Sequence, residues 1–292
     1  MLTFVFSGVI SFIGNVARKL FPSYFRRRDD FQVLYLSENY LVVYKPFDIL
    51  MNSDSNDKET LQTMISRQFP NLANPNLGHQ FHFVHRLDLV TSGVVCVALS
   101  KKAAKEAGDS FSKREVKKFY VALIRGWPSK NSFSINEPIG ENKYEVETSR
   151  KMCVGSDKNC IKPRNAHTRV QVLERGLYEN YPATKVLLRP LTGRRHQLRV
   201  HLSQLGHTIV GDFTYSNKKD NSPPRTFLHS LWIKFPSKIE ESKFLDIRSE
   251  DPFQEIAGWK SLRVCSSLLE PNIFDLLEID HCILQSDTSA KQ

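Results

Sequence analysis

Short apolar runs separated by polar turns begin at about residue 31 and predict a folded body that contains both strands and helices. Residues 33–36 and 41–44 have the pattern of two strands around a polar turn. Between residues 61 and 69 the apolar side chains recur at helical spacing, and Pro70 marks the end of that helix. The folded body is therefore expected to start with a strand pair and a helix.

The run Val94–Leu99 is short, continuous and rich in β-branched residues, which is typical of a strand buried on both faces. Ser100 follows it and can cap a helix whose apolar residues lie between 103 and 111. Residues 118–124 resume the β pattern. A loop in front of Val94 would thus be attached to a rigid core strand.

The second half of the chain is less regular. Residues 129–164 have weak periodicity and many turn residues, which predicts hairpins and loops, and residues 168–173 and 184–188 have the pattern of further strands. Strands and helices mix without a regular strand–helix alternation. The sequence therefore predicts an α+β fold.

One more helix is expected to open at Thr192-Gly193 and to run to about Leu205. Arg195 and Arg199 are four residues apart on this helix, so they would lie together beside its buried leucine stripe. Both guanidinium groups could then face a cleft.

The net charge of +10 is unevenly distributed along the chain. Residues 1–28 carry +5 and residues 240–292 carry −6, which leaves +11 for residues 29–239. A basic body of this size suits a polyanion such as nucleic acid, although a membrane surface or simple solubility would also explain it. Charge by itself leaves the partner open.

The first thirty residues combine an interrupted apolar stretch with basic residues that follow it. A secretory signal would place the positive charge first, and a spanning helix needs about 20 apolar residues, so both fit poorly and no stable membrane span is expected. A mitochondrial presequence fits better, but an amphipathic surface segment or a simple extension has the same composition. Localisation stays open between mitochondrial and cytoplasmic.

The five cysteines are scattered and include no Cys-x-x-Cys pair, which indicates a reducing compartment and thiols that act as small apolar side chains. His196 and His201 would point about 140° apart around a helix, without an acidic residue nearby. No metal site is expected.

Three segments carry the candidate chemistry. They are His85–Gly93 (His-Arg-Leu-Asp-Leu-Val-Thr-Ser-Gly), Lys118–Ala122 (Lys-Phe-Tyr-Val-Ala) and Leu191–His201 (Leu-Thr-Gly-Arg-Arg-His-Gln-Leu-Arg-Val-His), with Gly206-His207 and Gly211-Asp212 following. Alone, the first segment could be a structural turn in which Asp88 caps backbone amides. In their order and spacing, however, the three segments resemble the motifs of the RluA-type pseudouridine synthases.

The resemblance covers roughly residues 31–236, which are taken as the catalytic domain, between an N-terminal extension (1–30) and a C-terminal extension (237–292). Three further tripeptides resemble an animal branch of the family more closely still: Phe47-Asp48-Ile49, Gly176-Leu177-Tyr178 and Asp251-Pro252-Phe253.

The resemblance implies a mixed, mostly antiparallel sheet with flanking helices and a central catalytic cleft, and it implies no metal and no organic cofactor. It also implies the reaction. Uridine in RNA, such as tRNA or rRNA, becomes pseudouridine when the base leaves the anomeric carbon of the ribose, turns, and is rejoined through its carbon 5. Because the substrate supplies every atom of the product, RNA is the only partner that the resemblance requires.

The same resemblance assigns three catalytic positions. Asp88 matches the essential aspartate, either as nucleophile at the anomeric carbon or as base at the ribose, a choice that stays open. Arg199 matches the arginine that pairs with this aspartate and fixes its orientation. Tyr120 matches the tyrosine that stacks on uracil and can help to remove the proton from carbon 5.

Four basic residues are the candidate RNA contacts. Arg86 matches the residue that fills the gap left when the target uridine is unstacked. Lys118, Arg194 and Arg195, together with the amino end of the helix after Thr192-Gly193, are candidates for phosphate contacts. His85 is expected to be a structural residue bonded to the backbone.

This chain departs from the family pattern at three places. Phe47-Asp48 follows Lys45-Pro46 where a small residue and Gly are usual, Arg195 replaces the usual Thr, and Ser216 replaces Gly. Two alternatives stay open, an inactive relative that binds RNA and a hydrolytic nucleosidase that stops after base release. The sequence does not determine the oligomeric state, and a monomer is one option.

Overall fold

The computed structural model describes residues 31–55, 57–148, 151–270 and 272–279. The described residues between Phe31 and Ile279 belong to one compact unit. The predicted N-terminal extension and its presequence alternative, as well as Cys282, lie outside the described residues. No helix in the described part is both long and apolar enough to cross a membrane.

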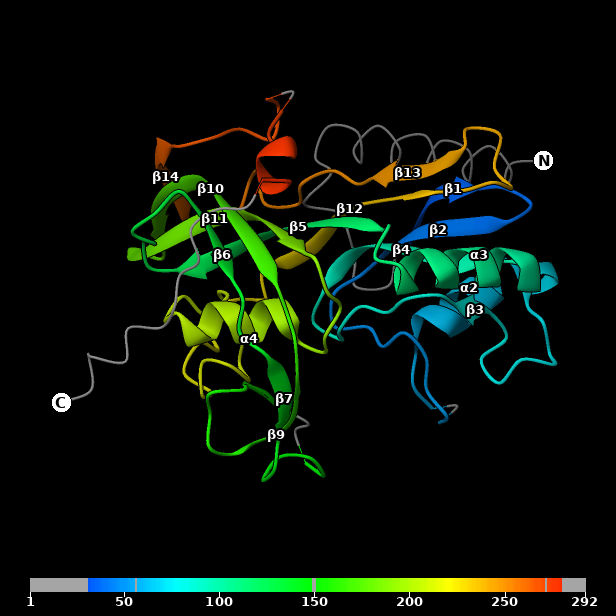
Figure 1. Cartoon of the computed structure of the whole chain (residues 1–292), viewed down its shortest axis with the longest axis horizontal. Coiled ribbons are helices and arrows are strands. Elements are labelled where there is room, and N and C mark those ends of the chain that lie inside the picture. Colours follow the sequence, from blue (N-terminus) through cyan, green and yellow to red (C-terminus); the bar gives the residue numbers. More distant parts are fainter. Residues whose placement is uncertain (1–30, 56, 149–150, 271, 280–292) are drawn as a thin grey trace, which may run out of the picture. The chain divides into compact units, whose positions relative to one another are not determined.

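A large twisted sheet dominates this unit (Figure 1). Its main path, in order across the sheet, is β1 (Gln32–Leu36), β2 (Tyr40–Lys45), β4 (Ser92–Ala98), β12 (Leu228–Pro236), β5 (Lys117–Arg125), β11 (Tyr181–Pro190), β10 (Thr168–Tyr178) and β14 (Trp259–Val264). Off this path, β3 (His82–Phe83) pairs with β4, β6 (Ser132–Ile135) with β10, and β13 (Phe244–Arg248) with β12. Antiparallel pairing prevails, and β4–β12 is parallel, which confirms the mixed, mostly antiparallel α+β fold.

The two halves of the sheet are joined by the parallel pairing of β4 with β12, in which Gly93 lies opposite Ser230. The backbone of Gly93 has a φ of +114°. A Cβ on Gly93 would lie 2.1 Å from the carbonyl oxygen of Ser230, which is an impossible contact. The glycine of the Thr-Ser-Gly segment is therefore required by the close approach of the two backbones.

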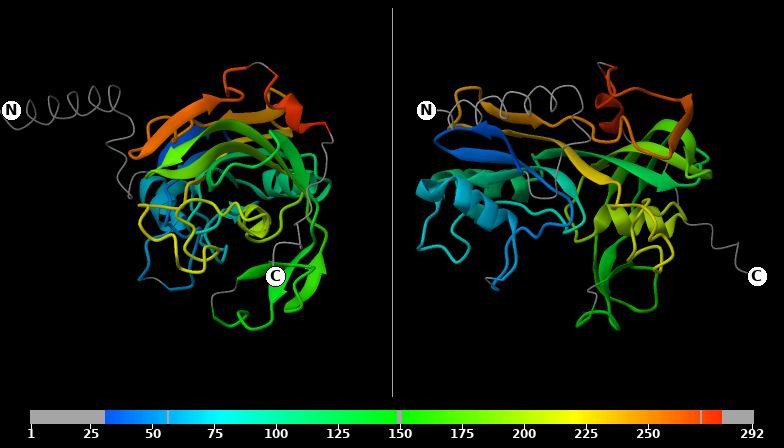
Figure 2. Two further views of the ribbon diagram at one scale, coloured as in Figure 1. Left: turned by 90° about the vertical axis from the view of Figure 1, so that its left-hand side faces the viewer. Right: turned by 180° about the vertical axis from the view of Figure 1, so that it is seen from behind.

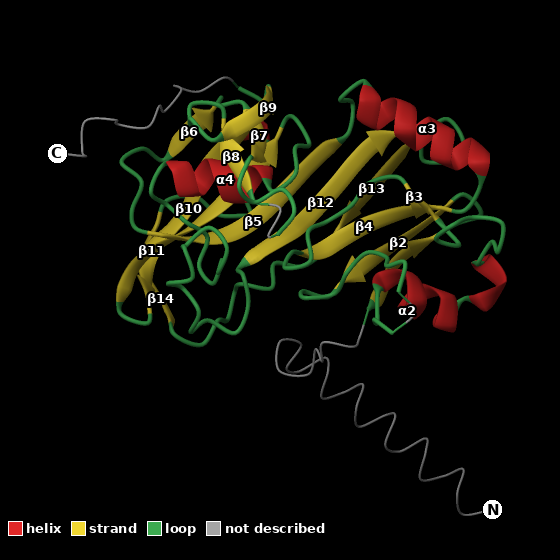
Figure 3. Cartoon of the chain, turned by 90° about the horizontal axis from the view of Figure 1, so that it is seen from below, coloured by secondary structure: helices red, strands yellow, loops and turns green. Residues whose placement is uncertain are grey.

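Helices α2 (Leu61–Gln68) and α3 (Lys101–Ser112) pack on opposite faces of β2 and β4 (Figure 3). Val43 and Val95 belong to the apolar cluster of α2, whereas Val42 and Cys96 belong to that of α3. Every residue of β4 is buried, as the continuous apolar run predicts. The side chain of Ser100 caps α3 by accepting a hydrogen bond from the Ala103 N–H, which is also as predicted.

Helix α4 (Gln197–Gln204) covers β5, β10 and β11 through Leu198 and Leu202. Tyr120, on β5, packs against both this cluster and the cluster around α2. The tyrosine therefore marks the boundary between the two packed regions on one side of the sheet.

A small second sheet contains β8 (Met152–Val154), β7 (Ile139–Asn142) and β9 (Cys160–Arg164), in that order. It projects away from the large sheet (Figure 2). Val154 packs in one cluster with Val200 of α4 and with Tyr215. These strands confirm the hairpins and loops predicted for residues 129–164.

The described part of the C-terminal segment adds to the same unit. Strands β13 and β14 pair with β12 and β10, and the short 3₁₀ helix η2 (Asp275–Leu277) places Leu277 in one apolar cluster with Val121 and Leu123 of β5. Residues 237–270 and 272–279 therefore extend the sheet and cover its face opposite α4 (Figure 1). The functional division at residue 236 stays a prediction.

Two sequence predictions were wrong in their boundaries. The strands expected at 168–173 and 184–188 are longer, because β10 and β11 form one continuous hairpin. The helix expected from Thr192 begins only at Gln197. The Gln197 side chain accepts hydrogen bonds from the Thr192 hydroxyl (2.6 Å) and from the Arg194 N–H (2.9 Å), which holds the preceding segment as a turn instead of a helix.

Candidate active site

The loop between β3 and β4 carries Asp88 and is fixed on several sides. The Nε2 of His85 accepts a hydrogen bond from the Cys96 N–H of β4 at 2.9 Å, and the His85 ring stacks on Phe111 of α3 with centroids 5.2 Å apart. Leu87 is buried. The predicted bond of His85 to the backbone is confirmed, and the segment just before Asp88 is held against β4 and α3.

Lys45 reaches the same loop from the end of β2 and is fully buried. Its ammonium donates to three backbone carbonyl oxygens, those of Pro46 (2.9 Å), Ile49 (2.6 Å) and Leu89 (3.1 Å). Burial, together with the positive charge of Arg225, lowers the pKa of Lys45 to about 7, against the opposing effect of Asp88. Since Leu89 follows Asp88, Lys45 helps to set the path of the loop, a role that the sequence analysis did not assign.

The pH dependence of stability tests whether buried His85 contributes to the folded state. Burial lowers its pKa to about 3, whereas an exposed histidine has about 6.5, so the unfolded chain binds the extra proton first as the pH falls. The stabilising contribution is complete above pH 6.5 and is lost as the pH falls toward 3. Between pH 7 and pH 5, the free energy of unfolding should fall by about 2 kcal/mol more in the wild type than in His85→Gln, as measured by urea denaturation. An equal pH dependence of the free energy of unfolding in the two proteins would contradict this role.

Arg199 projects from α4 and is buried between two carboxylates. Its Nε and Nη2 donate to both oxygens of Asp212, at 2.7 and 2.9 Å, while its Nη1 lies 3.4 Å from Oδ2 of Asp88. Burial would lower the pKa of Arg199, but the bonds to Asp212 and the charge of Asp88 outweigh it, so the pKa is raised. The predicted Asp88–Arg199 pair is present, but Asp212 is the principal partner of the arginine.

Asp212 is completely buried and also accepts a hydrogen bond from the Tyr215 N–H at 3.1 Å. The Gly211-Asp212 dipeptide follows the Leu191–His201 segment, but the sequence indicates no role for it. An acidic residue thirteen positions beyond a helix arginine carries no local signal of a contact, because only the fold brings the two together.

Tyr215 and His196 complete the surroundings of the Asp88 carboxylate. The ring centre of Tyr215 lies 5.0 Å from the guanidinium carbon of Arg199, and its hydroxyl is 2.9 Å from Nδ1 of His196 and accepts the Met152 N–H at 3.0 Å. His196 places Nε2 4.0 Å from Oδ1 of Asp88. Burial lowers the pKa of His196 to about 4 despite the charge of Asp88, so the imidazole is neutral near pH 7.

Tyr120 lies half-buried on β5, opposite Leu188 of β11 and Ser230 of β12. Burial raises its pKa to about 12, and the negative charge of Asp88 contributes, while a hydrogen bond with Ser230 opposes the shift. Asp88 and Arg199, which the sequence placed in different motifs, are in contact, and Tyr120 lies near enough for the charge of Asp88 to affect its pKa.

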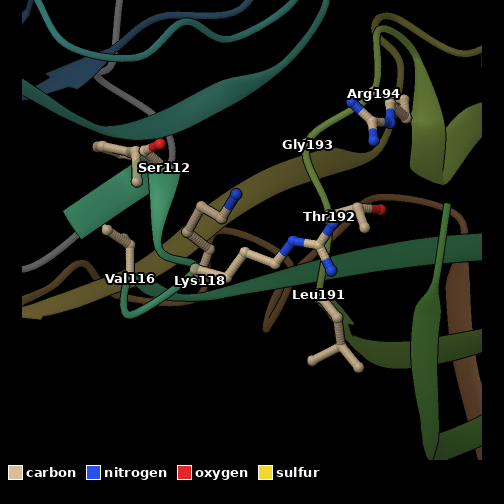
Figure 4. A pocket seen from close by; sticks show the side chains of 9 residues that line it. Ser112, Val116, Lys118, Leu191, Thr192, Gly193 and Arg194 are labelled. Carbon is tan, nitrogen blue, oxygen red and sulfur yellow. The ribbon is translucent and has the colours of Figure 1, made fainter. Parts of the chain in front are cut away.

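The predicted RNA contacts divide into two groups. Lys118 and Arg194 line one cavity (Figure 4), whereas Arg86 and Arg195 have exposed side chains. The expectation that Arg195 lies beside Arg199 on a helix was wrong. Arg195 precedes α4 and is exposed, while Arg199 is inside the helix and buried, because the helix starts two residues after Arg195.

The two histidines considered for a metal have other partners. His201 is fully buried, with Nδ1 2.9 Å from the Thr168 hydroxyl and Nε2 2.9 Å from the Glu137 carbonyl oxygen, and His196 bonds Tyr215. Within the described ranges, no three His, Cys, Asp or Glu side chains gather in a group that could hold a metal ion.

The sequence model of a family described as RNA pseudouridylate synthase matches residues 39–204. RNA pseudouridylate synthase domain-containing protein 1 of Danio rerio is 43% identical over 252 residues, which are 85% of this chain and 84% of that protein. The dual-specificity RNA pseudouridine synthase RluA of Escherichia coli (strain K12) is 35% identical over 210 residues, 70% of this chain and 87% of that protein. A solved structure of human RNA pseudouridylate synthase domain containing 1 matches with a TM-score of 0.74 and 36% identity, over 87% of this chain and 98% of that one.

Proposed function

Because the chain belongs to the RNA pseudouridylate synthase family, we propose that it isomerises uridine to pseudouridine in structured RNA with Asp88 as the catalytic carboxylate. The family resemblance drawn from the motifs, including the closer likeness to the animal branch, is confirmed. The observation that carries the assignment to Asp88 is its position 3.4 Å from an arginine that a second, buried carboxylate holds in place.

The surroundings of Asp88 support this role in physical terms. Its side chain keeps one quarter of its surface exposed, whereas Asp212 has none, so Asp88 is the carboxylate of this pair that a substrate can reach. Arg199 is locked by two bonds to Asp212 and can orient Asp88 without being displaced itself. A preorganised carboxylate of this kind can act on the ribose either as nucleophile or as base.

Tyr120 is proposed to stack on the uracil and to position it. With a pKa raised to about 12, the phenol stays protonated at neutral pH. It therefore cannot take the proton from carbon 5 directly unless its own proton first moves to another acceptor. Stacking and hydrogen bonding fit this protonation state better than direct base catalysis.

Release of tritium from carbon 5 of uridine tests the proposed reaction, because that hydrogen must leave when the base is rejoined through carbon 5. RNA from cells that lack this protein, labelled at carbon 5, should release tritium when the wild-type protein is added. RNA from cells that contain the protein serves as the control, and it should release less because its target sites are already modified.

The two alternatives give different products. Binding of the labelled RNA without release of tritium from any RNA pool would favour the inactive relative. Free uracil among the products, with an abasic site left in the RNA, would favour the hydrolytic nucleosidase. Either result would overturn the proposed isomerisation.

A further inference from the structure

A basic cavity lies outside the group of side chains around Asp88. It has a volume of about 430 Å³ and lies between the end of α3, the start of β5 and the turn before α4. Arg114, Lys118 and Arg194 line it, and none of the described residues around it is acidic. In Figure 4 the ammonium of Lys118 and the guanidinium of Arg194 both point toward the space beside Gly193.

The cations of this cavity have few protein partners. Lys118 makes no hydrogen bond or ion pair with any described residue, and its ammonium lies 5.6 Å from the centre of the Phe111 ring. Arg194 donates to the Asn165 carbonyl oxygen at 3.0 Å. Burial lowers the pKa of Lys118 to about 8, which reflects an ammonium that has lost water without gaining an anion.

Two arginines from other segments add to the same positive field. Burial lowers the pKa of Arg194, and the charges of Arg164 on β9 and of Arg114 lower it further. Neither Arg114 nor Arg164 pairs with an acidic side chain in the described part of the chain. Arg114, which follows α3, therefore lines the cavity with Lys118 of β5 and Arg194 of the turn before α4. Arg164 of β9 adds its charge at Arg194. Like charges gathered in this way are costly unless an anion joins them.

The backbone favours an anion at this place as well. The N–H of Gly193 donates to no acceptor among the described residues, and a Cβ on Gly193 would lie 3.6 Å from Nζ of Lys118. Arg114 has a φ of +62°, in the left-handed region where Gly or Asn is usual after a helix. An arginine that occupies this position in spite of its backbone preference points to a use for its side chain.

The position of the cavity relative to Asp88 indicates which anion it binds. Lys118 and Tyr120 are two residues apart on β5, so their Cα atoms are about 7 Å apart and their side chains share a face of the sheet. The charge of Lys118 lowers the pKa of His85, which lies three residues before Asp88. Arg194 is two residues before His196, whose ring lies 4.0 Å from the Asp88 carboxylate. An anion in the cavity would therefore lie next to a uridine held at Asp88.

We propose that this cavity binds one backbone phosphate of the RNA beside the target uridine, and that Arg114 and Arg164 belong to this phosphate site with Lys118 and Arg194. The choice of RNA as the ligand rests on the proposed function. The phosphate contact fixes the register of the strand, so that the neighbouring uridine meets Asp88.

A thermodynamic cycle between one phosphate and one arginine tests the site. The probe is an RNA stem-loop with a single uridine in its loop, made in versions that each carry one uncharged methylphosphonate at a different loop phosphate. Binding is measured for the wild type, for Arg114→Asn, which suits a left-handed backbone, for Arg164→Gln, and for the control Lys102→Gln. Lys102 is exposed at the opposite end of α3.

One methylphosphonate position should weaken binding to the wild type about tenfold or more, and the same change should have little further effect in Arg114→Asn and Arg164→Gln. The slope of log K against log salt should become shallower by about 0.7 to 0.9 in each of these two variants. Lys102→Gln should keep the wild-type pattern. Absence of any coupled position, an equal effect of Lys102→Gln, or failure of the wild type to bind the probe would overturn the proposal.

Tritium release separates this inference from the proposed function. Release by the wild type without phosphate coupling would contradict the phosphate site alone. Coupling without release would contradict the isomerisation and leave the phosphate site supported.

Discussion

Replacement of Asp88 by Asn is expected to lower tritium release from uridine by about 10³-fold or more while RNA affinity changes little. The amide has nearly the same shape as the carboxylate but can act neither as nucleophile nor as base at the ribose. Arg199 stays in place, because Asp212 makes its two shortest bonds. Single-turnover tritium release and equilibrium RNA binding, measured on the same variant, separate the chemical step from binding.

Asp48→Asn is the matched control for this variant. Asp48 is another partly buried aspartate close enough to Lys45 to affect its pKa, and its φ of +57° is one that Asn tolerates. This control should keep a rate close to that of the wild type. A full rate in Asp88→Asn, or an equal loss in both variants, would show that Asp88 is not the catalytic carboxylate.

Asp212→Asn is expected to lower the free energy of unfolding by about 3 to 5 kcal/mol and to lower turnover as well. The change removes the charge that neutralises a buried guanidinium, because the Arg199 side chain is only 5% exposed and Asp212 is fully buried. Without the carboxylate of Asp212, Arg199 is no longer held in the position from which it orients Asp88. Urea denaturation gives the stability, and tritium release at a temperature where the variant is folded gives the rate.

The double variant Arg199→Gln with Asp212→Asn separates the loss of stability from the loss of turnover. It contains no unpaired buried charge, so it should recover part of the stability lost in Asp212→Asn, whereas turnover should stay low because nothing orients Asp88. Asp251→Asn is the control, since Asp251 pairs with Lys185 at 2.5 Å and both side chains are as deeply buried. It should lose comparable stability and keep its rate. Wild-type turnover in folded Asp212→Asn would contradict the positioning role.

Local patterns in the sequence predicted a large part of the fold correctly. The continuous apolar run at Val94–Leu99 identified β4, which is buried on both faces, and Ser100 identified the start of α3. These features depend on the period of apolar side chains and on one capping side chain, which neighbouring residues alone determine. The motif resemblance likewise predicted the contact between Asp88 and Arg199.

Predictions were weakest where a contact between distant residues decides the local structure. The helix start at Gln197 depends on a side chain that bonds backward to Thr192 and Arg194, and this turn leaves Arg195 outside the helix that contains Arg199. The ends of β10 and β11 depend on their pairing with each other and not on their own apolar pattern. Local propensity cannot encode such partners.

The sequence by itself determined the strands and helices of the core, the family motifs and the residues that are proposed to carry the chemistry, because periodicity, caps and motif spacing are properties of short segments. Only the tertiary structure decided how those residues are supported. It placed Asp88 against Arg199, 111 positions away, and made Asp212 the partner that holds the arginine. It also joined Lys45 to the carbonyl of Leu89 and gathered Arg114, Lys118 and Arg194 around one cavity. The physical reason is that ion pairs and buried hydrogen bonds depend on distance in space and on exclusion of water, and both arise only when the sheet has brought remote segments together.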